Sequence, residues 1–372
     1  MLPSLTAGAS ARGTSVASPI ATPMSGYSAQ TMANLDKMLS DLLKRSPGAV
    51  VYVDSPAGVY QQARGVGSLA TNSLLPVDAP FQIGSNTKMM TAAIILQLWE
   101  AGQLSLDDPI SLYLPDVASK LRFGEAITVR MLLNHTSGVY DYFNDFVAAD
   151  FLAWTEDGGT ASMTRAWTPQ QIVDYVLTYR TDDFAFRPGE PGKWQYTNTG
   201  YILLGLIIEK ITGKSYAQNL QVRIFDPLGM THTTLGDESP PASNVASYYQ
   251  KPYEIETSAW NLSQAWAAGA VISTPPDLAV FLRALLHGKL FQRPETLTAM
   301  QTTIGGSSPG AKYALGLINI GDGLWGHGGA TLGFQSAAAY DVNRDIVFIA
   351  WTNCATAPAG AYAKLLPQLI VP

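Results

Sequence analysis

A serine and a lysine, Ser85 and Lys88, stand three residues apart at the start of a predicted helix over residues 86–101. Residues at this spacing lie on one face of a helix, so the hydroxyl and the amine are expected to be neighbours. A serine hydroxyl becomes a nucleophile when a base takes its proton, and a lysine can be that base if burial lowers its pKa. The largely apolar sequence after Lys88 offers such surroundings. The pair predicts nucleophilic catalysis, with a serine cap and a solvated lysine as the alternative.

Tyr196 and Asn198 follow a Pro/Gly-rich loop at 187–192 and precede an apolar segment. A tyrosine beside the nucleophile can pass a proton to the leaving group, and a carboxamide can hold both the lysine and a substrate carbonyl. Tyr142 and Asn144 have the same spacing in an aromatic loop and are the rival pair. We favour Tyr196 because a Pro/Gly-rich loop before a helix holds a side chain at a lip between two elements. A buried tyrosine with a capping Asn remains the alternative.

His327 is followed by Gly328 and Gly329, between a glycine-rich turn and a strand-like run. Glycines let a backbone approach a ligand closely, which an oxyanion hole or a strand-like substrate contact requires. A single histidine in a loop is more often structural, and that alternative stays open for His327.

The elements that must position these residues follow from hydrophobic periodicity. The pattern predicts a capped helix over 28–45 and strands near both ends of the chain. The strand-like runs are 49–53, 59–64, 333–341 and 346–351. A helix is expected over about 358–369, while the interior reads as helices separated by long loops. The interior helices are expected at 86–101, 129–134, 168–179, 199–212 and 274–286.

These patterns predict a division of the chain. Residues 1–27, rich in Ala, Ser, Thr, Pro and Gly, read as a flexible leader. Residues 28–80 and 266–372 are expected to form one discontinuous α/β sheet domain. Residues 81–265 are expected to form a mainly helical domain that carries the nucleophile helix. The first and last segments would then build one sheet, with terminal helices packed on it.

Several segments carry a family resemblance when taken together. FQIG precedes the serine at 81–84, and the others read ITVRMLLNHTSG at 127–138, YTNTGYILLG at 196–205, AGAVISTP at 268–275 and HGGATLGF at 327–334. In this order and spacing they resemble the penicillin-recognising serine hydrolases: D-alanyl-D-alanine peptidases, class C β-lactamases, and esterase and D-amino-acid amidase relatives. The loop at 139–145 is similar to secreted D-alanyl-D-alanine carboxypeptidases. The resemblance covers most of the chain and implies an α/β (α+β), β-lactamase-like fold: an antiparallel sheet flanked by N- and C-terminal helices, with a mainly helical domain inserted.

The resemblance also implies roles. Ser85 would attack the acyl carbonyl while Lys88 takes its proton. Tyr196 would pass a proton to the leaving group and help to activate the water that frees the acyl group. Asn198 would position the acyl chain, and His327 would support the proton network. No metal or organic cofactor is implied, because water is the final acceptor.

A second set of residues is expected to contact substrate. The backbone N–H groups of the nucleophile and of Ala330 would form the oxyanion hole, beside Gly328 and Gly329. Tyr142 and Trp266 are expected to line an apolar acyl or leaving-group pocket, with ordinary packing as the alternative.

Two departures from the pattern bear on the substrate. Carboxypeptidase members usually hold a terminal carboxylate with a hydroxyl after the histidine and with a nearby basic residue. This chain has Gly328 in the first place, and residues 314–320 contain no Arg or Lys. We therefore expect a D-amino-acid peptidase or amidase first and a small-molecule esterase second. A β-lactamase or a non-turnover penicillin-binding sensor is expected less, the former because the third motif lacks Lys.

Composition limits the partners. The 372 residues carry a net charge of −6 and 47% hydrophobic residues. Nucleic-acid binding is not expected, because phosphate contacts need clustered Lys and Arg. No stretch approaches the ~18 apolar residues of a membrane helix. The histidines show no paired-ligand spacing, so no metal site is expected. The leader could remain after removal of a signal peptide, which favours a secreted or periplasmic location; the oligomeric state is not indicated.

Overall fold

The computed structural model describes residues 26–157, 163–236, 245–249, 255–308, 311–359, 363 and 369–370. Most of the expected leader lies outside these residues, as does most of the expected C-terminal helix. Tyr27, at the end of the expected leader, is described: its hydroxyl donates to the Gly58 carbonyl at 2.8 Å and is 2.7 Å from the Ser55 hydroxyl.

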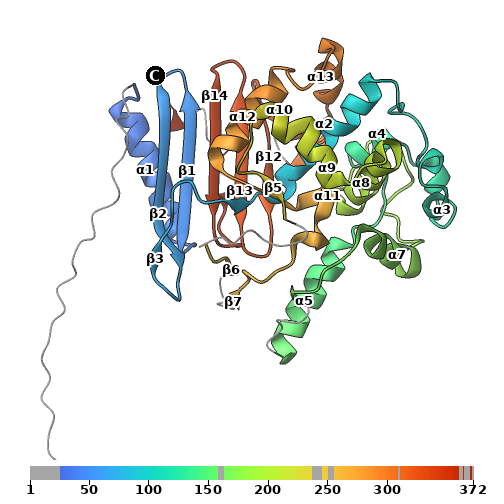
Figure 1. Cartoon of the computed structure of the whole chain (residues 1–372), viewed down its shortest axis with the longest axis horizontal. Helices are drawn as coiled ribbons and strands as arrows, with labels where there is room; N and C mark the ends of the chain where they lie inside the picture. The colour runs from blue at the N-terminus through green and yellow to red at the C-terminus, as the bar shows by residue number, and fades with distance from the viewer. Residues whose placement is uncertain are drawn as a thin grey trace, which may run out of the picture.

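A nine-stranded antiparallel sheet forms one side of the molecule (Figure 1), in the order β3-β2-β1-β14-β13-β12-β11-β10-β9. Its strands are β1 Gly48–Ser55, β2 Gly58–Ser68, β3 Ser73–Leu74, β9 Ile304–Ser308, β10 Ala311–Tyr313, β11 Ile318–Gly321, β12 Leu324–Ala330, β13 Gln335–Asp341 and β14 Ile346–Thr352. β1 pairs with β14 in the register Ala49↔Thr352. The expectation that both ends of the chain build one sheet is therefore confirmed for its central strands.

The sheet is covered on both faces because side chains alternate along its central strands. Val51 packs in one apolar cluster with helix α1 (Ala29–Leu43), through residues such as Leu39. Its neighbour Val50 belongs to a second cluster, with helix α12 (Pro275–Leu286). α1 begins where the sequence predicts, since the Ser28 hydroxyl accepts a hydrogen bond from the Thr31 backbone N–H.

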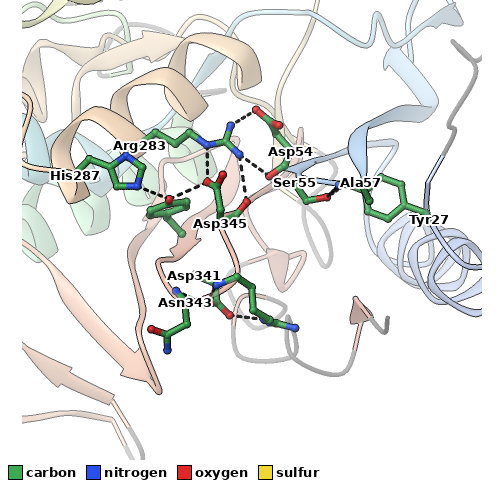
Figure 2. Close-up of polar contacts among 11 residues, drawn as sticks. Tyr27, Asp54, Ser55, Ala57, Arg283, His287, Asp341, Asn343 and Asp345 are labelled. Carbon is green, nitrogen blue, oxygen red and sulfur yellow. Dashed lines mark hydrogen bonds and ion pairs between the residues drawn. The ribbon is translucent and has the colours of Figure 1, made fainter.

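An arginine joins α12 to the ends of the sheet (Figure 2). Arg283 forms ion pairs with the carboxylates of Asp54, on β1, and Asp345, in the turn before β14. It also donates to the main-chain carbonyls of both residues, at 3.1 and 3.3 Å. Tyr340 donates to Asp345 at 2.8 Å and lies 2.7 Å from Nε2 of His287. One guanidinium therefore fixes a helix, a strand end and a turn.

Helices form the other side of the molecule, around α2 (Thr87–Glu100). α2 is buried nearly all round and packs against α8 and α11, so its apolar sequence needs no polar face. The remaining α-helices are α3 Pro115–Ala118, α4 Val129–Leu133, α5 Phe143–Asp157, α7 Pro169–Tyr179, α8 Asn198–Thr212, α9 Tyr216–Leu220, α10 Asp226–Leu228, α11 Trp266–Gly269 and α13 Pro294–Met300. Short helical turns are η1 Gly84–Asn86, η2 Ile110–Leu112, η3 Gly124–Ala126, η5 Leu262–Gln264 and the π-helical η4 Gln221–Phe225.

Threonine caps start three of these helices as the sequence predicts. The hydroxyls of Thr128, Thr168 and Thr274 each accept a hydrogen bond from a backbone N–H in the first turn of α4, α7 or α12. None of the described helices is long and apolar enough to cross a membrane.

Two small sheets complete the architecture. β4 (Phe81–Gln82), β8 (Val271–Ser273) and β5 (Thr234–Leu235) form a three-stranded sheet, and β6 (Tyr248–Tyr249) pairs with β7 (Ile255–Glu256). The Phe81↔Ser273 pairing holds the chain just before η1, the turn that contains Ser85. A paired strand therefore leads directly into the turn that carries Ser85.

Candidate active site

Ser85 lies on the turn η1, which is pressed against the end of β12. Gly84 has φ +54°, and a Cβ there would lie 2.7 Å from the Ala330 backbone nitrogen. A Cβ on Gly329 would overlap the Ile83 carbonyl oxygen. Both positions require glycine, for the left-handed backbone and for the close approach. The two segments whose N–H groups are expected to form the oxyanion hole are thus in contact.

Asn86 ties this turn to the sheet and was not singled out in the sequence. Its side chain is fully buried and donates to the Ile83 carbonyl at 2.7 Å and to the Ser336 hydroxyl, on β13, at 2.9 Å. Ser336 donates to the same Ile83 carbonyl at 3.1 Å. These bonds fix the turn that carries Ser85 relative to β13, the strand that pairs with β12.

Lys88 is fully buried, and its Nζ lies 3.1 Å from Ser85 Oγ. It also lies 2.7 Å from Asn198 Oδ1 and 2.7 Å from the Ala268 carbonyl oxygen. Burial lowers the pKa of Lys88 to about 7, although the nearby charge of Asp141 acts in the opposite direction. A neutral amine has two hydrogens and one lone pair. Its hydrogens can go to the two carbonyl-type oxygens, which only accept, so its lone pair can face the Ser85 hydroxyl.

Asp141 orients Asn198. Its carboxylate accepts from Asn198 Nδ2 at 3.1 Å and from the Asn198 backbone N–H at 3.1 Å. Because a carboxylate only accepts, the amide nitrogen must face Asp141 and the amide oxygen must face Lys88. Burial raises the pKa of Asp141, while hydrogen bonds and the Lys88 charge lower it. In this geometry Asn198 contacts Lys88 and Asp141, and its expected role in positioning an acyl chain stays a prediction.

Tyr196 lies on the other side of the lysine and the serine. Lys88 Nζ is 4.8 Å from the centre of its ring. Burial raises the pKa of Tyr196 well above its usual value, and a hydrogen bond with Ser85 acts in the opposite direction. The phenol is therefore a proton donor at neutral pH. The rival Tyr142 is fully buried, and its hydroxyl donates to the Gln264 carbonyl, away from Ser85.

His327 lies on β12, its ring centre 6.3 Å from that of Tyr196. It is buried, and burial lowers its pKa to about 3. Its Nδ1 is 2.6 Å from the Gly328 carbonyl and its Nε2 is 3.0 Å from the hydroxyl of Tyr313, a β10 residue that the sequence did not single out.

His135 is a further buried histidine beside Tyr196, with ring centres 4.3 Å apart. Its Nδ1 accepts from the Thr197 backbone N–H at 3.3 Å, and Nε2 has no hydrogen-bond partner among the residues that the structure describes. Its φ of +63° is unusual for a residue other than glycine. Burial and the charge of Lys88 lower its pKa well below the usual value.

The structure thus brings most of the predicted residues together. Trp266 is 4% exposed, and a Cβ on Gly205 would overlap its ring, so it packs against α8. Tyr142 is also fully buried. The expectation that these two side chains line a pocket stays a prediction. The residues that lie together are Ser85, Lys88, Tyr196, Asn198, His327, Gly328, Gly329 and Ala330.

The arrangement is suited to acyl transfer. A buried amine can accept the Ser85 proton, and a phenol with a raised pKa can donate one. α2 and α8 both begin here, at Thr87 and Asn198, and helix N-termini favour negative charge. Among the described residues, no group of three or more His, Cys, Asp or Glu side chains could hold a metal ion.

Solved structures with a similar fold are known. A D-stereospecific amidohydrolase from a Streptomyces species is 32% identical, with a TM-score of 0.78 over 90% of this chain and 97% of that one. A D-amino acid amidase from Ochrobactrum anthropi SV3, solved with L-phenylalanine amide, is 27% identical, with a TM-score of 0.76 over 92% of this chain and 96% of that one.

Curated proteins show the same relationship. A teichoic acid D-alanine hydrolase from Staphylococcus aureus is 29% identical over 57% of this chain and 47% of its own length. The chain spans 44% to 62% of the length of curated relatives of this kind. The beta-lactamase family matches residues 35–369, which is most of the chain. The chain therefore belongs to the beta-lactamase family and is a serine hydrolase with a β-lactamase-like fold.

Proposed function

We propose that this hydrolase cleaves amide bonds next to D-amino acids through an acyl-enzyme on Ser85. The observation that carries the proposal is the state of Lys88. Its amine is fully buried, has a pKa of about 7, and lies 3.1 Å from the Ser85 hydroxyl. A lysine with the usual pKa would be a cation at neutral pH and could not accept the proton.

The proposed reaction has two steps. In the first, Lys88 takes the Ser85 proton as Oγ attacks the carbonyl carbon, and Tyr196 gives its proton to the departing amine. In the second, Tyr196 takes a proton from water, whose oxygen attacks the ester, and Lys88 returns its proton to Ser85 Oγ as the acid leaves. The backbone N–H groups of Ser85 and Ala330 would stabilise the oxyanion, and one such donor contributes about 10²–10³ in rate.

The proposed substrate class rests on what stands beside the nucleophile. A free carboxylate on the substrate would need a charge-assisted partner, and each such bond contributes roughly 1.5–3 kcal/mol. Gly328 and Ala330 offer no side-chain donor, and residues 314–320 contain no Arg or Lys. This favours D-amino-acid amides over peptides that end in a free carboxylate. The names of the amidohydrolase, amidase and D-alanine hydrolase relatives support the same class.

The test is a rate comparison on paired substrates. The wild type and Ser85→Ala would each be incubated with D- and L-phenylalanine amide, D-alanine amide, D-alanyl-D-alanine and p-nitrophenyl acetate. We expect the D-amides to be preferred over both the L-amide and the dipeptide, with no turnover by Ser85→Ala. Equal rates on D- and L-amides would contradict the D-amide assignment, and residual turnover by the variant would remove Ser85 as nucleophile.

An esterase is the second candidate, favoured by the same lack of a carboxylate partner. Fast cleavage of p-nitrophenyl acetate with no amide cleavage would support it. The intact mass of the protein after incubation with benzylpenicillin distinguishes the two remaining candidate functions. A lasting adduct on Ser85 without amide turnover would indicate a penicillin-binding sensor, and rapid loss of penicillin would indicate a β-lactamase.

A further inference from the structure

The two ring nitrogens of His327 have different partners. Nδ1 lies 2.6 Å from the Gly328 carbonyl oxygen. Because a carbonyl only accepts, Nδ1 must carry a hydrogen and donate it. Nε2 lies 3.0 Å from the Tyr313 hydroxyl, which can either donate or accept. The protonation of the imidazole therefore depends on the direction in which Tyr313 points its proton.

Tyr313 is fully buried, so its hydroxyl cannot exchange the His327 contact for bulk water. The printed contact of this hydroxyl is with Nε2 of His327. The nearby Tyr201 hydroxyl donates to the Leu133 carbonyl at 2.8 Å.

The contact with Tyr313 leaves two arrangements. If His327 is neutral, its one ring hydrogen is on Nδ1 and the Tyr313 hydroxyl donates to Nε2. If His327 is an imidazolium, Nε2 carries a hydrogen and donates to the Tyr313 oxygen. The charge of the histidine and the direction of the Tyr313 hydroxyl are therefore coupled.

The charged and titratable groups around His327 decide between the two. The ring faces Tyr196 and Tyr313, and the charges of Lys88 and His135 also act on it. None of these four side chains is an anion at neutral pH, since burial raises the pKa of both phenols. A positive charge on His327 would be desolvated beside a lysine that must itself gain a proton in turnover, so the neutral arrangement is favoured.

We propose that Tyr313 is a positioning residue, which holds His327 neutral with its proton on Nδ1 and makes it a fixed hydrogen-bonding spacer rather than an acid or a base. This proposal rests on the proposed function of the site. It leaves Lys88 and Tyr196 as the groups that carry protons. It also gives the Nδ1–H a structural task, because its bond to Gly328 fixes the strand segment that leads to Ala330.

Imidazole ¹⁵N NMR tests the tautomer without any turnover. We expect wild-type His327 at pH 7 to show a protonated Nδ1 and a bare, hydrogen-bonded Nε2, whose resonance moves downfield in Tyr313→Phe. Tyr340→Phe is the matched control, since Tyr340 makes a similar contact with His287, 2.7 Å from its Nε2, away from the site. It should leave the His327 signals unchanged. A protonated Nε2 in the wild type would overturn the proposal.

Kinetics supply the second test. Tyr313→Phe should lower kcat about tenfold, the effect of losing one hydrogen bond. Tyr340→Phe should leave kcat unchanged. His327→Gln can still accept from Tyr313 and donate to a carbonyl, so it should keep kcat within about tenfold of the wild type. A loss of a thousandfold or more in His327→Gln, with native folding, would show that proton transfer by the imidazole is required and would overturn the spacer role. If no substrate is turned over, the NMR result still stands.

Discussion

Lys88 links the chemistry of this site to pH, because only its neutral form can accept the Ser85 proton. Its pKa is lowered to about 7, so the neutral fraction grows as the pH rises through that value. We expect kcat/KM to rise about tenfold per pH unit below pH 7 and to level off above it. Initial rates on a D-amino-acid amide between pH 5 and 9, corrected with Ser85→Ala, measure this. A flat profile from pH 5 to 8 would contradict the lysine base.

Asp141 tunes that lysine through its charge as well as through Asn198. The carboxylate raises the pKa of Lys88, so Asp141→Asn should lower it and move the acid limb of kcat/KM to lower pH, by up to about one unit. The new amide oxygen can still accept from Asn198, which preserves the local fold. Asp145→Asn is the matched control, because Asp145 pairs with Arg180 and has no contact with Asn198. An identical shift in both variants would contradict a specific effect of Asp141.

Two adjacent glycines on β12, Gly328 and Gly329, look alike in the sequence but differ in the space around them. A Cβ on Gly329 would overlap the Ile83 carbonyl, whereas the nearest atom to a Cβ on Gly328 is the Ser336 oxygen at 3.7 Å. Gly329→Ala must push β12 away from η1, and misplacement of about 1 Å near reacting groups costs roughly 10² in rate. We expect Gly329→Ala to lower both Tm and kcat, while Gly328→Ala keeps the wild-type Tm. Equal Tm values for Gly328→Ala and Gly329→Ala would contradict the close contact between Gly329 and the Ile83 carbonyl.

The contacts that Arg283 makes with Asp54 and Asp345 join α12 to two parts of the sheet, and we expect them to contribute to stability rather than to catalysis. Lysine cannot reproduce the forked contacts to Asp54 and Asp345, so Arg283→Lys should reduce the free energy of unfolding by about 1–3 kcal/mol. Urea unfolding measures this change. Arg130→Lys is the comparison, because Arg130 pairs with Asp107 on an exposed surface and should lose below about 1 kcal/mol. If Arg283→Lys lost no more free energy of unfolding than Arg130→Lys, the contacts of Arg283 would not contribute to stability beyond those of a surface ion pair.

At the scale of the whole molecule, the sequence predicted what depends on local pattern. The caps at Ser28, Thr128 and Thr168, the strands at both ends and the pairing of Ser85 with Lys88 all follow from periodicity or short spacing. The family resemblance supplied the fold. Residues whose function depends on tertiary proximity were harder to predict.

Asp141 and Tyr313 illustrate why the rest of the site was not predicted. Asp141 reaches Asn198 across 57 positions of sequence, and nothing in its loop indicates that contact. Tyr313 is one of 17 tyrosines, and it reaches His327 only because β10 and β12 both pair with β11 in the sheet. Tyr142 and Trp266 were expected at the pocket because large aromatic side chains suit binding sites and cores equally well.

The pairing of β1 with β14 sets the order in which the chain can finish folding during synthesis. β1 is made early, yet its partner β14 emerges about 300 positions later, and loop closure over such a distance is entropically costly. Until then β1 and β13 each have an unpaired side, which is prone to aggregation. A chain that stops at Asp345 should therefore elute as soluble aggregates in size-exclusion chromatography, whereas the full chain should elute with the native fold. The nascent chain therefore carries an unfinished sheet until its last strand has been made.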